Sequence, residues 1–182
     1  MTKKHLLIVG IIFSSLMLFA KPALFISGNT AECTGYTGFL GTDAWTVHKK
    51  INVQGGWSFN EKWTCYLCAG ADFCRELKTF TPFSSLTDSF SMRCGIGGRY
   101  SEDNFALDLN AGLEITDMAM DSLNKYADIY SEFTLSVQIF RYGGFAGFFT
   151  VPLSFAFNGC GCNFDLGLGT SIVYRVFFGG SK

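Results

Sequence analysis

Six charged residues stand at positions where they could form three ion pairs. Each occupies a polar position in a stretch where polar and apolar residues alternate, which places it on the polar face of a predicted β-strand. Opposite charges that face each other across two strands stabilise a sheet. The pattern therefore predicts ion pairing rather than catalysis. The predicted pairs are Lys50 with Asp72, Arg93 with Glu114, and Arg99 with Asp108.

One further group has the residue types for nucleophilic chemistry. In the predicted pairing His48 faces Cys74, with Asp72 and Glu76 nearby, and a histidine can serve as the base for a thiol. No signature serine–histidine spacing accompanies the group. A histidine held inside a fold by hydrogen bonds is the commoner arrangement. We therefore predict no enzymatic activity and no catalytic residue.

The seven cysteines do not form a metal-binding pattern. Cys65 and Cys68 would point to opposite faces of one strand, which excludes a shared tetrahedral zinc ion. Cys160 and Cys162 flank a predicted loop, and Cys74 is expected near the same end of the sheet. A disulfide among them is an option in an oxidising compartment. An odd count leaves at least one free thiol. We expect no metal and no cofactor.

The elements that position these residues are clearest in one hairpin. The segment from Phe90 to Thr116 reads FSMRCGIGGRYSEDNFALDLNAGLEIT and alternates on both sides of Asp103-Asn104, a pair suited to a tight turn. This turn sets Glu102 opposite Phe105, and the charged pairs follow. Each run is about eleven residues long, against about five or six for a soluble strand. A soluble sandwich is the alternative, but such lengths are typical of strands that cross a bilayer.

Composition favours the same class. The 182 residues include 20 Phe, 7 Tyr and 3 Trp, and only 16% are charged, against about 25% in soluble domains. The formal net charge of −1 gives no reason to expect a nucleic-acid partner.

The chain begins with a predicted signal peptide, residues 1–20, with cleavage after Ala20 or Ala23. Lys3 and Lys4 precede an apolar core of about fifteen residues, short of the roughly twenty that a membrane helix needs. An uncleaved anchor helix is the alternative. Since only helices and closed barrels satisfy their backbone in lipid, residues 24–182 are either soluble and secreted or a barrel.

Eight strands are expected. The first is placed near 29–39, with Glu32, Thr34 and Tyr36 facing inward, and Lys49 is an outward charge near the end of the second strand. Connections at 60–62, 103–104 and 142–144 are tight, and those between them, at 40–44, 76–88, 118–126 and 159–161, are longer on average. The predicted fold is an all-β, eight-stranded antiparallel up-and-down transmembrane β-barrel.

Aromatic residues recur near the predicted strand ends and would form two interfacial girdles. They are Trp45, Trp57, Phe59, Trp63, Phe73, Phe90, Tyr100, Phe105, Phe145, Phe157 and Phe178.

With these features the chain resembles the small eight-stranded outer-membrane barrels: the opacity-protein and OmpW-like family, and the OmpX and OmpA barrel domains. Its last strand is similar to the signal that the barrel-assembly machinery recognises, although Gly179 to Lys182 follow the terminal aromatic residue. The cysteine and phenylalanine content and the atypical cleavage site suggest a spirochaete-like source. The residues that match the signal are Gly169, Ile172, Tyr174, Val176 and Phe178.

Eight strands leave an interior just wide enough for side chains, so the predicted ion pairs favour a charge-paired plug over a narrow polar path. The expected interior charges are Glu32, His48, Lys50, Asp72, Arg93, Arg99, Asp108, Glu114, Asp128, Glu132, Asp165 and Arg175.

We predict a structural, surface-exposed protein of the bacterial outer membrane. Its expected partners are outer-membrane lipid, the barrel-assembly machinery and host factors at the outer loops, with no nucleic acid. The alternative, implied by the OmpW resemblance, is a channel or transporter for small hydrophobic solutes.

Overall fold

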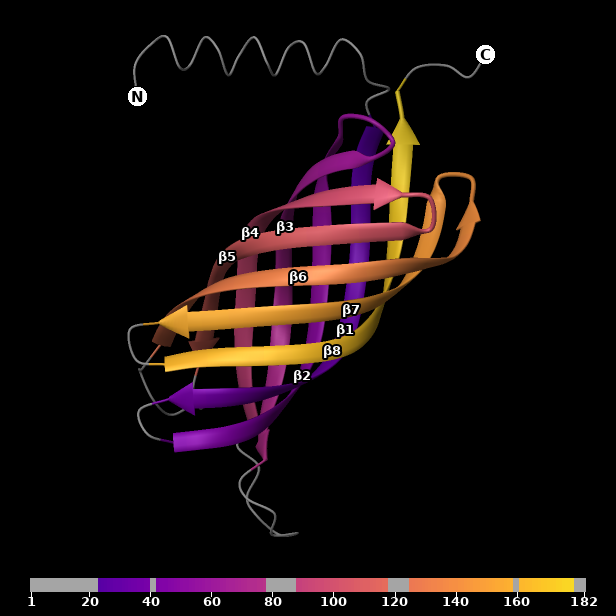
Figure 1. Cartoon of the computed structure of the whole chain (residues 1–182). Coiled ribbons are helices and arrows are strands. Elements are labelled where there is room, and N and C mark those ends of the chain that lie inside the picture. The colour runs from indigo at the N-terminus through magenta and orange to yellow at the C-terminus, as the bar shows by residue number, and fades with distance from the viewer. Residues whose placement is uncertain (1–22, 40–41, 78–87, 118–124, 159–160, 179–182) are drawn as a thin grey trace, which may run out of the picture.

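The computed structural model describes residues 23–39, 42–77, 88–117, 125–158 and 161–178. Eight strands close into a barrel in which each strand pairs antiparallel with its neighbours in the sequence, and the last pairs with the first (Figure 1). Within these ranges no helix is long and apolar enough to cross a membrane. The strands are β1 (Ala23–Phe39), β2 (Thr42–Ser58), β3 (Trp63–Leu77), β4 (Asp88–Glu102), β5 (Phe105–Asp117), β6 (Lys125–Tyr142), β7 (Phe145–Asn158) and β8 (Gly161–Phe177).

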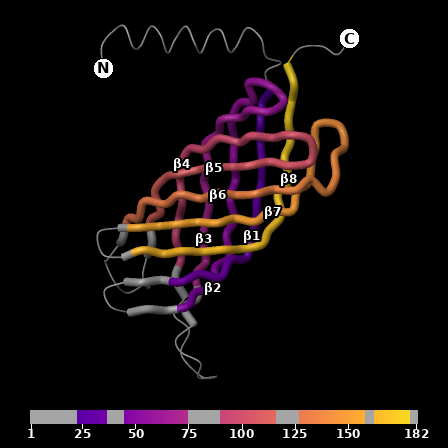
Figure 2. The backbone as a smooth tube through the Cα atoms, in the orientation of Figure 1, coloured from indigo at the N-terminus to yellow at the C-terminus, as the bar shows by residue number. Residues whose placement is uncertain are grey.

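The barrel has two different ends. At the first, which we call the turn end, short turns join β2 to β3, β4 to β5 and β6 to β7, and β1 begins where β8 finishes (Figure 2). Asp103 (φ 48°) and Gly143 (φ 58°) give two of these turns their left-handed residue. In the third, Asn60 Oδ1 accepts hydrogen bonds from the backbone nitrogens of Lys62 and Trp63, at 2.9 and 2.7 Å. The opposite end is called the loop end.

The hairpin register predicted from the sequence is confirmed. Arg93 lies opposite Glu114 and Arg99 opposite Asp108. In the β2–β3 pair, Lys50 lies opposite Asp72, as expected. The predicted signal peptide, residues 1–20, falls outside the described residues, and Ala23, one predicted cleavage position, is the first residue of β1.

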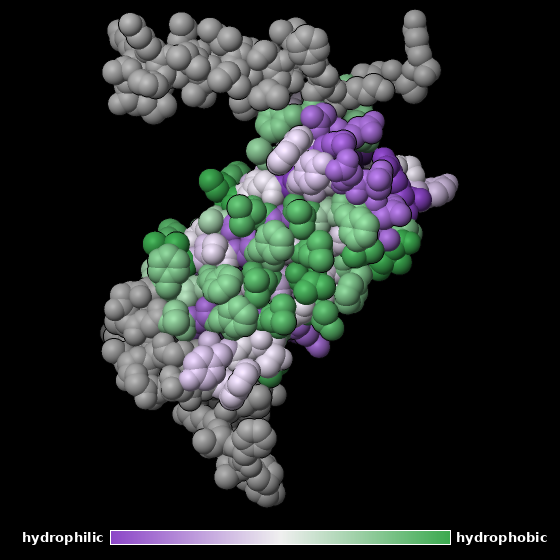
Figure 3. Space-filling view, viewed as in Figure 1, coloured by the Kyte–Doolittle hydropathy of each residue, from purple (hydrophilic) through white to green (hydrophobic). Residues whose placement is uncertain are grey.

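The side chains are sorted inside out relative to a soluble protein. Leu67 and Ile96 are each 67% exposed on the outer wall, whereas the buried set is mostly polar or charged. Figure 3 shows the result on one face: apolar residues cover the middle of the barrel, and hydrophilic residues gather at the turn end. Such a wall is stable against lipid rather than water.

The prediction for the first strand was wrong in extent and in orientation. β1 begins at Ala23, and Glu32 and Thr34 face outward with Tyr36, while Phe25 and Cys33 point inward. The stretch after Ile26 contains few large apolar residues, so alternation alone could not show which of its side chains face inward. Pairing with both β2 and β8 determines this instead.

Lys49 was also misplaced. It is the eighth residue of the 17-residue β2 and so lies near the middle of the strand rather than near its end. Its side chain faces outward, as predicted.

Candidate functional site in the barrel interior

A network of charged side chains crosses the interior in the half nearer the loop end. Arg93 of β4 is its centre. Its Nη2 lies 2.7 Å from Glu114 Oε2 and 3.2 Å from Asp72 Oδ2, and its Nη1 lies 3.4 Å from Glu132 Oε2. One guanidinium therefore contacts carboxylates from β3, β5 and β6. The Tyr130 ring covers it, with 5.1 Å between the guanidinium carbon and the ring centroid.

Lys50 forms the other half of this network. The prediction that it pairs with Asp72 holds for the register only, because its ammonium turns across the interior. Lys50 Nζ lies 2.9 Å from Asp165 Oδ2 of β8 and also donates to the Ser154 hydroxyl of β7. Only β1 lies between β2 and β8, so the lysine side chain can reach Asp165. Asp72 is already held by Arg93 and His48.

His48 lies between the Arg93 group and the Lys50 group of the network. Its Nδ1 lies 3.0 Å from Asp72 Oδ2 and its Nε2 lies 3.2 Å from Asp165 Oδ1. Every member of the network is at most 6% exposed. Buried charges are tolerated only when they are paired. This network pairs charges from six strands, and a seventh strand contributes the Ser154 hydroxyl. We call it the charged layer: His48, Lys50, Asp72, Arg93, Glu114, Glu132, Ser154 and Asp165.

Three residues of the charged layer lie close enough together to be compared with a metal site. Ligand atoms of His48, Asp72 and Asp165 all lie within 4.8 Å of one another. However, Lys50 and Arg93 already place a cationic group on each carboxylate. The His48 imidazole faces Asp72 with Nδ1 and Asp165 with Nε2. One metal ion bound to a single imidazole nitrogen would therefore not lie between the histidine and both carboxylates. The donor set fits an ion-pair network better than a metal centre.

The arrangement of His48 and Cys74 does not favour nucleophilic chemistry. Cys74 Sγ lies 3.6 Å from His48 Nε2, but that nitrogen is also 3.0 Å from Thr46 Oγ1 and 3.2 Å from Asp165. His48 is 5% exposed and belongs to the charged layer rather than the rim. The nitrogen that would serve as base is thus engaged by other groups.

The cysteines in the described ranges are free. Cys65 is exposed and Cys68 is buried, on the opposite faces predicted for them. Cys162 faces outward while Cys74 faces inward, so these two do not bond. Cys160, the remaining member of the predicted disulfide group, lies outside the described residues.

The turn-end half of the interior is built differently. Arg99 Nη1 lies 3.5 Å from Asp108 Oδ2, and its guanidinium carbon lies 4.5 Å from the centroid of the Phe148 ring. Beside it the rings of Phe25 and Tyr66 stack at 5.8 Å. The sequence predicted that Tyr66, Cys68 and Ala106 face inward but did not predict the apolar cluster that they form. The cluster contains Phe25, Tyr66, Cys68, Ala106, Phe148 and Val173.

Signals for the missed cluster were present but weak. Phe148 lies two residues before the inward Thr150 and so faces the same side of the strand. It sits in a run of apolar residues, however, where either face could be the inner one. Phe25 lies before the predicted start of the first strand. Gly97 gives the clearest local reason for the arrangement, because a Cβ there would lie 2.4 Å from the Tyr66 ring.

Little open space remains between the loop-end half and the turn-end half of the interior. The cavity that Lys50, Gln54, Arg99, Asp108 and Ser171 help to line has a volume of about 20 Å³, room for one or two water molecules. Gln54 Oε1, Ser171 Oγ and Asp108 Oδ1 are buried without a protein hydrogen-bond partner. The charged layer and the apolar cluster therefore fill the interior on either side of a very small polar cavity.

Outward aromatic residues gather at both ends of the wall. At the loop end the paired rings are Tyr36 with Trp45, Phe73 with Phe90, and Phe155 with Phe164. At the turn end they are Trp57 with Phe178, Trp63 with Tyr100, and Phe145 with Tyr174.

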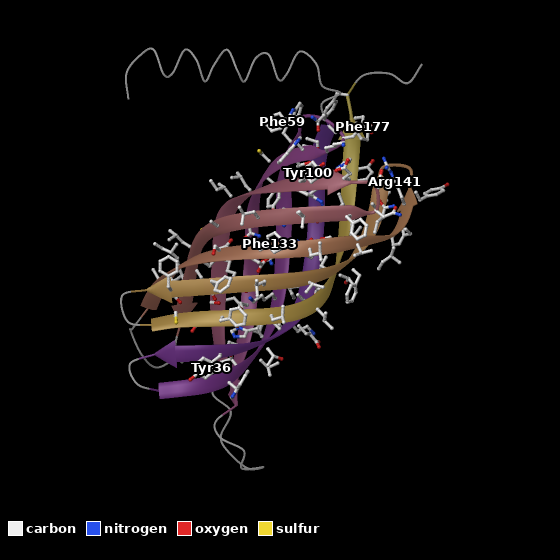
Figure 4. All side chains as sticks on the ribbon, viewed as in Figure 1. Tyr36, Phe59, Tyr100, Phe133, Arg141 and Phe177 are labelled. Atoms are coloured by element: carbon white, nitrogen blue, oxygen red, sulfur yellow. The ribbon has the colours of Figure 1, made fainter. Side chains whose placement is uncertain are left out.

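The other predicted girdle residues lie at the same two ends. Phe105 is exposed at the turn end and Phe157 at the loop end. Figure 4 places Phe59 and Tyr100 at the turn end, Tyr36 near the loop end, and Phe133 between them.

The residues of the predicted assembly signal lie on or just beyond the closing strand. Ile172 and Tyr174 face outward, Gly169 packs against Thr30 and Ala31 of β1, and Val176 pairs with Leu24. Phe178 follows the last residue of β8.

Solved structures with the same fold are outer-membrane proteins. The attachment invasion locus protein Ail of Yersinia pestis aligns with a TM-score of 0.52 at 9% identity, over 86% of this chain and 100% of that chain. Neisserial surface protein A (NspA) aligns with a TM-score of 0.50 at 12% identity, over 86% of this chain and 99% of that chain. No family model and no curated protein sequence matches. At these identities the likeness concerns the fold, which is that of small eight-stranded outer-membrane β-barrels.

Proposed function

We propose that this protein is a sealed barrel of a bacterial outer membrane with a structural and surface-exposed role. The observation that carries the proposal is the filled middle of the interior, where the charged layer and the apolar cluster leave a cavity of about 20 Å³ between them. A larger hollow of about 220 Å³ opens at the turn end, where Phe148 and Val173 of the apolar cluster line it. A barrel closed in this way has no path for solute. Its accessible surfaces are then the lipid-facing wall and the two ends.

The location in the outer membrane is supported by the wall itself. Its apolar residues are exposed over the middle of the barrel, and aromatic pairs bracket them at both ends. This is the order of side chains found in transmembrane barrels. The short turns would then face the periplasm and the loop end the cell exterior.

The surface role is supported by fold-level likeness to Ail, whose name describes attachment and invasion, and to NspA, named as a surface protein. The proposed partners are outer-membrane lipid around the wall, the barrel-assembly machinery at the last strand, and host factors at the loop end. We propose no enzymatic activity and no nucleic-acid partner.

Surface labelling of intact cells tests this function. An epitope inserted at the centre of residues 78–87 should bind antibody on unbroken cells, whereas the same epitope between Asp103 and Asn104 should bind only after lysis. Equal labelling at both positions on intact cells would contradict the orientation, and none at either would contradict the surface role.

Uptake of a labelled hydrophobic solute distinguishes the alternative conduit. Cells with and without the protein should accumulate the solute at the same rate, because charged side chains fill the interior. Faster uptake in cells that express the protein would favour the conduit over the sealed barrel.

A further inference from the structure

Two opposite charges stand side by side on the outer wall. Glu32 of β1 and Lys49 of β2 are directly opposite each other in the strand register. Both side chains are exposed on the face that carries the apolar residues. Within the part of the chain that the structure describes, neither charge lies within ion-pair distance of the other or of a third charge, in contrast to Lys50 and Arg93 of the charged layer.

These two residues lie between the aromatic girdles. Along β2, Lys49 is about 13 Å from Trp45 and about 26 Å from Trp57, at about 3.3 Å per residue. A lysine stem can carry its amine some way toward an interface. The shorter Glu32 side chain cannot do the same. A charge on a lipid-facing barrel wall destabilises the barrel more the deeper it lies in the bilayer. A polar or charged group that contacts Glu32 and Lys49 would therefore stabilise the protein in the membrane.

A groove beside the pair is lined by polar and apolar residues together. Three exposed threonines, Thr30, Thr34 and Thr170, lie near Glu32 on β1 and β8, and Gly28 continues the outward row on β1. In the strand register the pair is flanked by Leu168 on β8 and Phe73 on β3. The groove has a volume of about 850 Å³. Small and hydroxyl-bearing residues let two membrane-embedded surfaces approach closely and hydrogen-bond. We call Thr30, Glu32, Thr34, Lys49 and Thr170 the β1–β2 patch.

We infer that the β1–β2 patch binds a second copy of this chain, about a twofold axis parallel to the barrel axis. Such an axis makes the same patch meet itself. Because the two charges sit side by side, the rotation sets Glu32 of each copy opposite Lys49 of the other. Both charges are neutralised by one contact. A lipid phosphate would neutralise Lys49 alone and would be repelled by Glu32.

The inference rests on the membrane location proposed above, and a charge-swap series in lipid vesicles tests it. Full-length protein carrying one fluorophore is reconstituted, and association is measured by counting photobleaching steps at several protein densities. E32K and K49E should each weaken association at least tenfold, because each sets like charges opposite each other. The double variant E32K/K49E should restore it.

Mixing the two single variants gives the sharpest test. E32K and K49E should each be monomeric alone but should form mixed pairs together, since their patches then carry complementary charges. K62E, a charge change of the same sign as K49E but in the β2–β3 turn, should associate like the wild type. Gel mobility with and without heating checks that every variant is folded.

Several results would overturn the inference. One is a wild-type protein that floats with vesicles yet bleaches in single steps at every density. Another is a double variant that stays as weakly associated as the single ones. If K49E alone loses affinity for anionic vesicles while the wild type remains monomeric, the patch binds lipid headgroups instead. Failure to float with vesicles would count against the proposed membrane location and not against the patch.

Discussion

In the loop-end half of the interior, one guanidinium binds three carboxylates, whereas in the turn-end half another has a single carboxylate and a phenylalanine ring. Arg93 joins β4 to β3, β5 and β6. Arg99 joins β4 only to Asp108 of the adjacent β5 and lies over Phe148. The first half is closed by charges that cross the lumen, and the second by packed rings. The two halves should therefore respond very differently to loss of a single positive charge.

The largest effect is expected for R93M. Removing the guanidinium leaves Asp72, Glu114 and Glu132 buried without their shared cation, and breaking a buried pair costs about 3–5 kcal/mol. Urea-induced unfolding of the detergent-folded protein measures this loss. R93K, which keeps a charge at the same place, should lose less. An R93M variant that unfolds at the wild-type urea concentration would show that the charged layer does not stabilise the barrel.

A smaller loss is expected for R99M, because only Asp108 loses its partner and the methionine can still pack against Phe148. Breaking this single buried pair costs about 3 kcal/mol, the lower end of the range for buried ion pairs. The double variant R99M/D108N should recover part of the loss, since it removes the stranded charge. If R99M were as unstable as R93M in the same unfolding assay, the contrast between the two halves would fail.

The packed rings can be disturbed without altering any charge. G97A puts a Cβ 2.4 Å from the Tyr66 ring, and overpacking of this kind costs about 1–2 kcal/mol. G55A is the matched control, because nothing lies within 4 Å of a Cβ at that position. Thermal unfolding in detergent should separate the two variants. Equal stability would mean that the Tyr66 ring can move aside freely.

The smallest effect is expected for the exposed ion pair at the turn end. Lys62 Nζ lies 2.6 Å from Glu102 Oε1, with side chains about half exposed. Their hydrogen bond raises the pKa of Lys62 and lowers the pKa of Glu102. Any stabilisation is present between these two pKa values and is lost as pH falls through the lower one or rises through the higher one. Water and salt screen such a pair.

K62M should therefore unfold like the wild type at neutral pH, in low salt and in high. A clear loss of stability that disappears in high salt would mean that the turn end depends on its charges more than the packed rings imply.

Alternation predicted the hairpins well because turn and register are local. Once Asp103-Asn104 is the turn, the positions of Arg93 and Arg99 opposite their carboxylates follow from counting residues. The partner of Lys50 could not be found in this way. Its ammonium binds Asp165 on β8, and that distance exists only after the barrel has closed.

The closing of the barrel also determines which charged residues of β1 face outward. In β1 the residues from Ser27 to Tyr36 contain no large apolar alternation, so the orientation of Glu32 depends on pairing with β2 and β8. The prediction placed Glu32 among the interior charges, yet it lies outside, opposite Lys49. A residue that was predicted as an interior charge is thus half of the β1–β2 patch.

The central claim is that the charged layer and the apolar cluster seal the barrel, and conductance across a planar lipid bilayer tests it most directly. Folded wild-type protein should insert without producing steady ion current. R93M, measured beside it, should show more frequent current openings if the charged layer is the seal. Stable, reproducible conductance steps from the wild-type protein would contradict the account, because they require a continuous aqueous path through the interior described here.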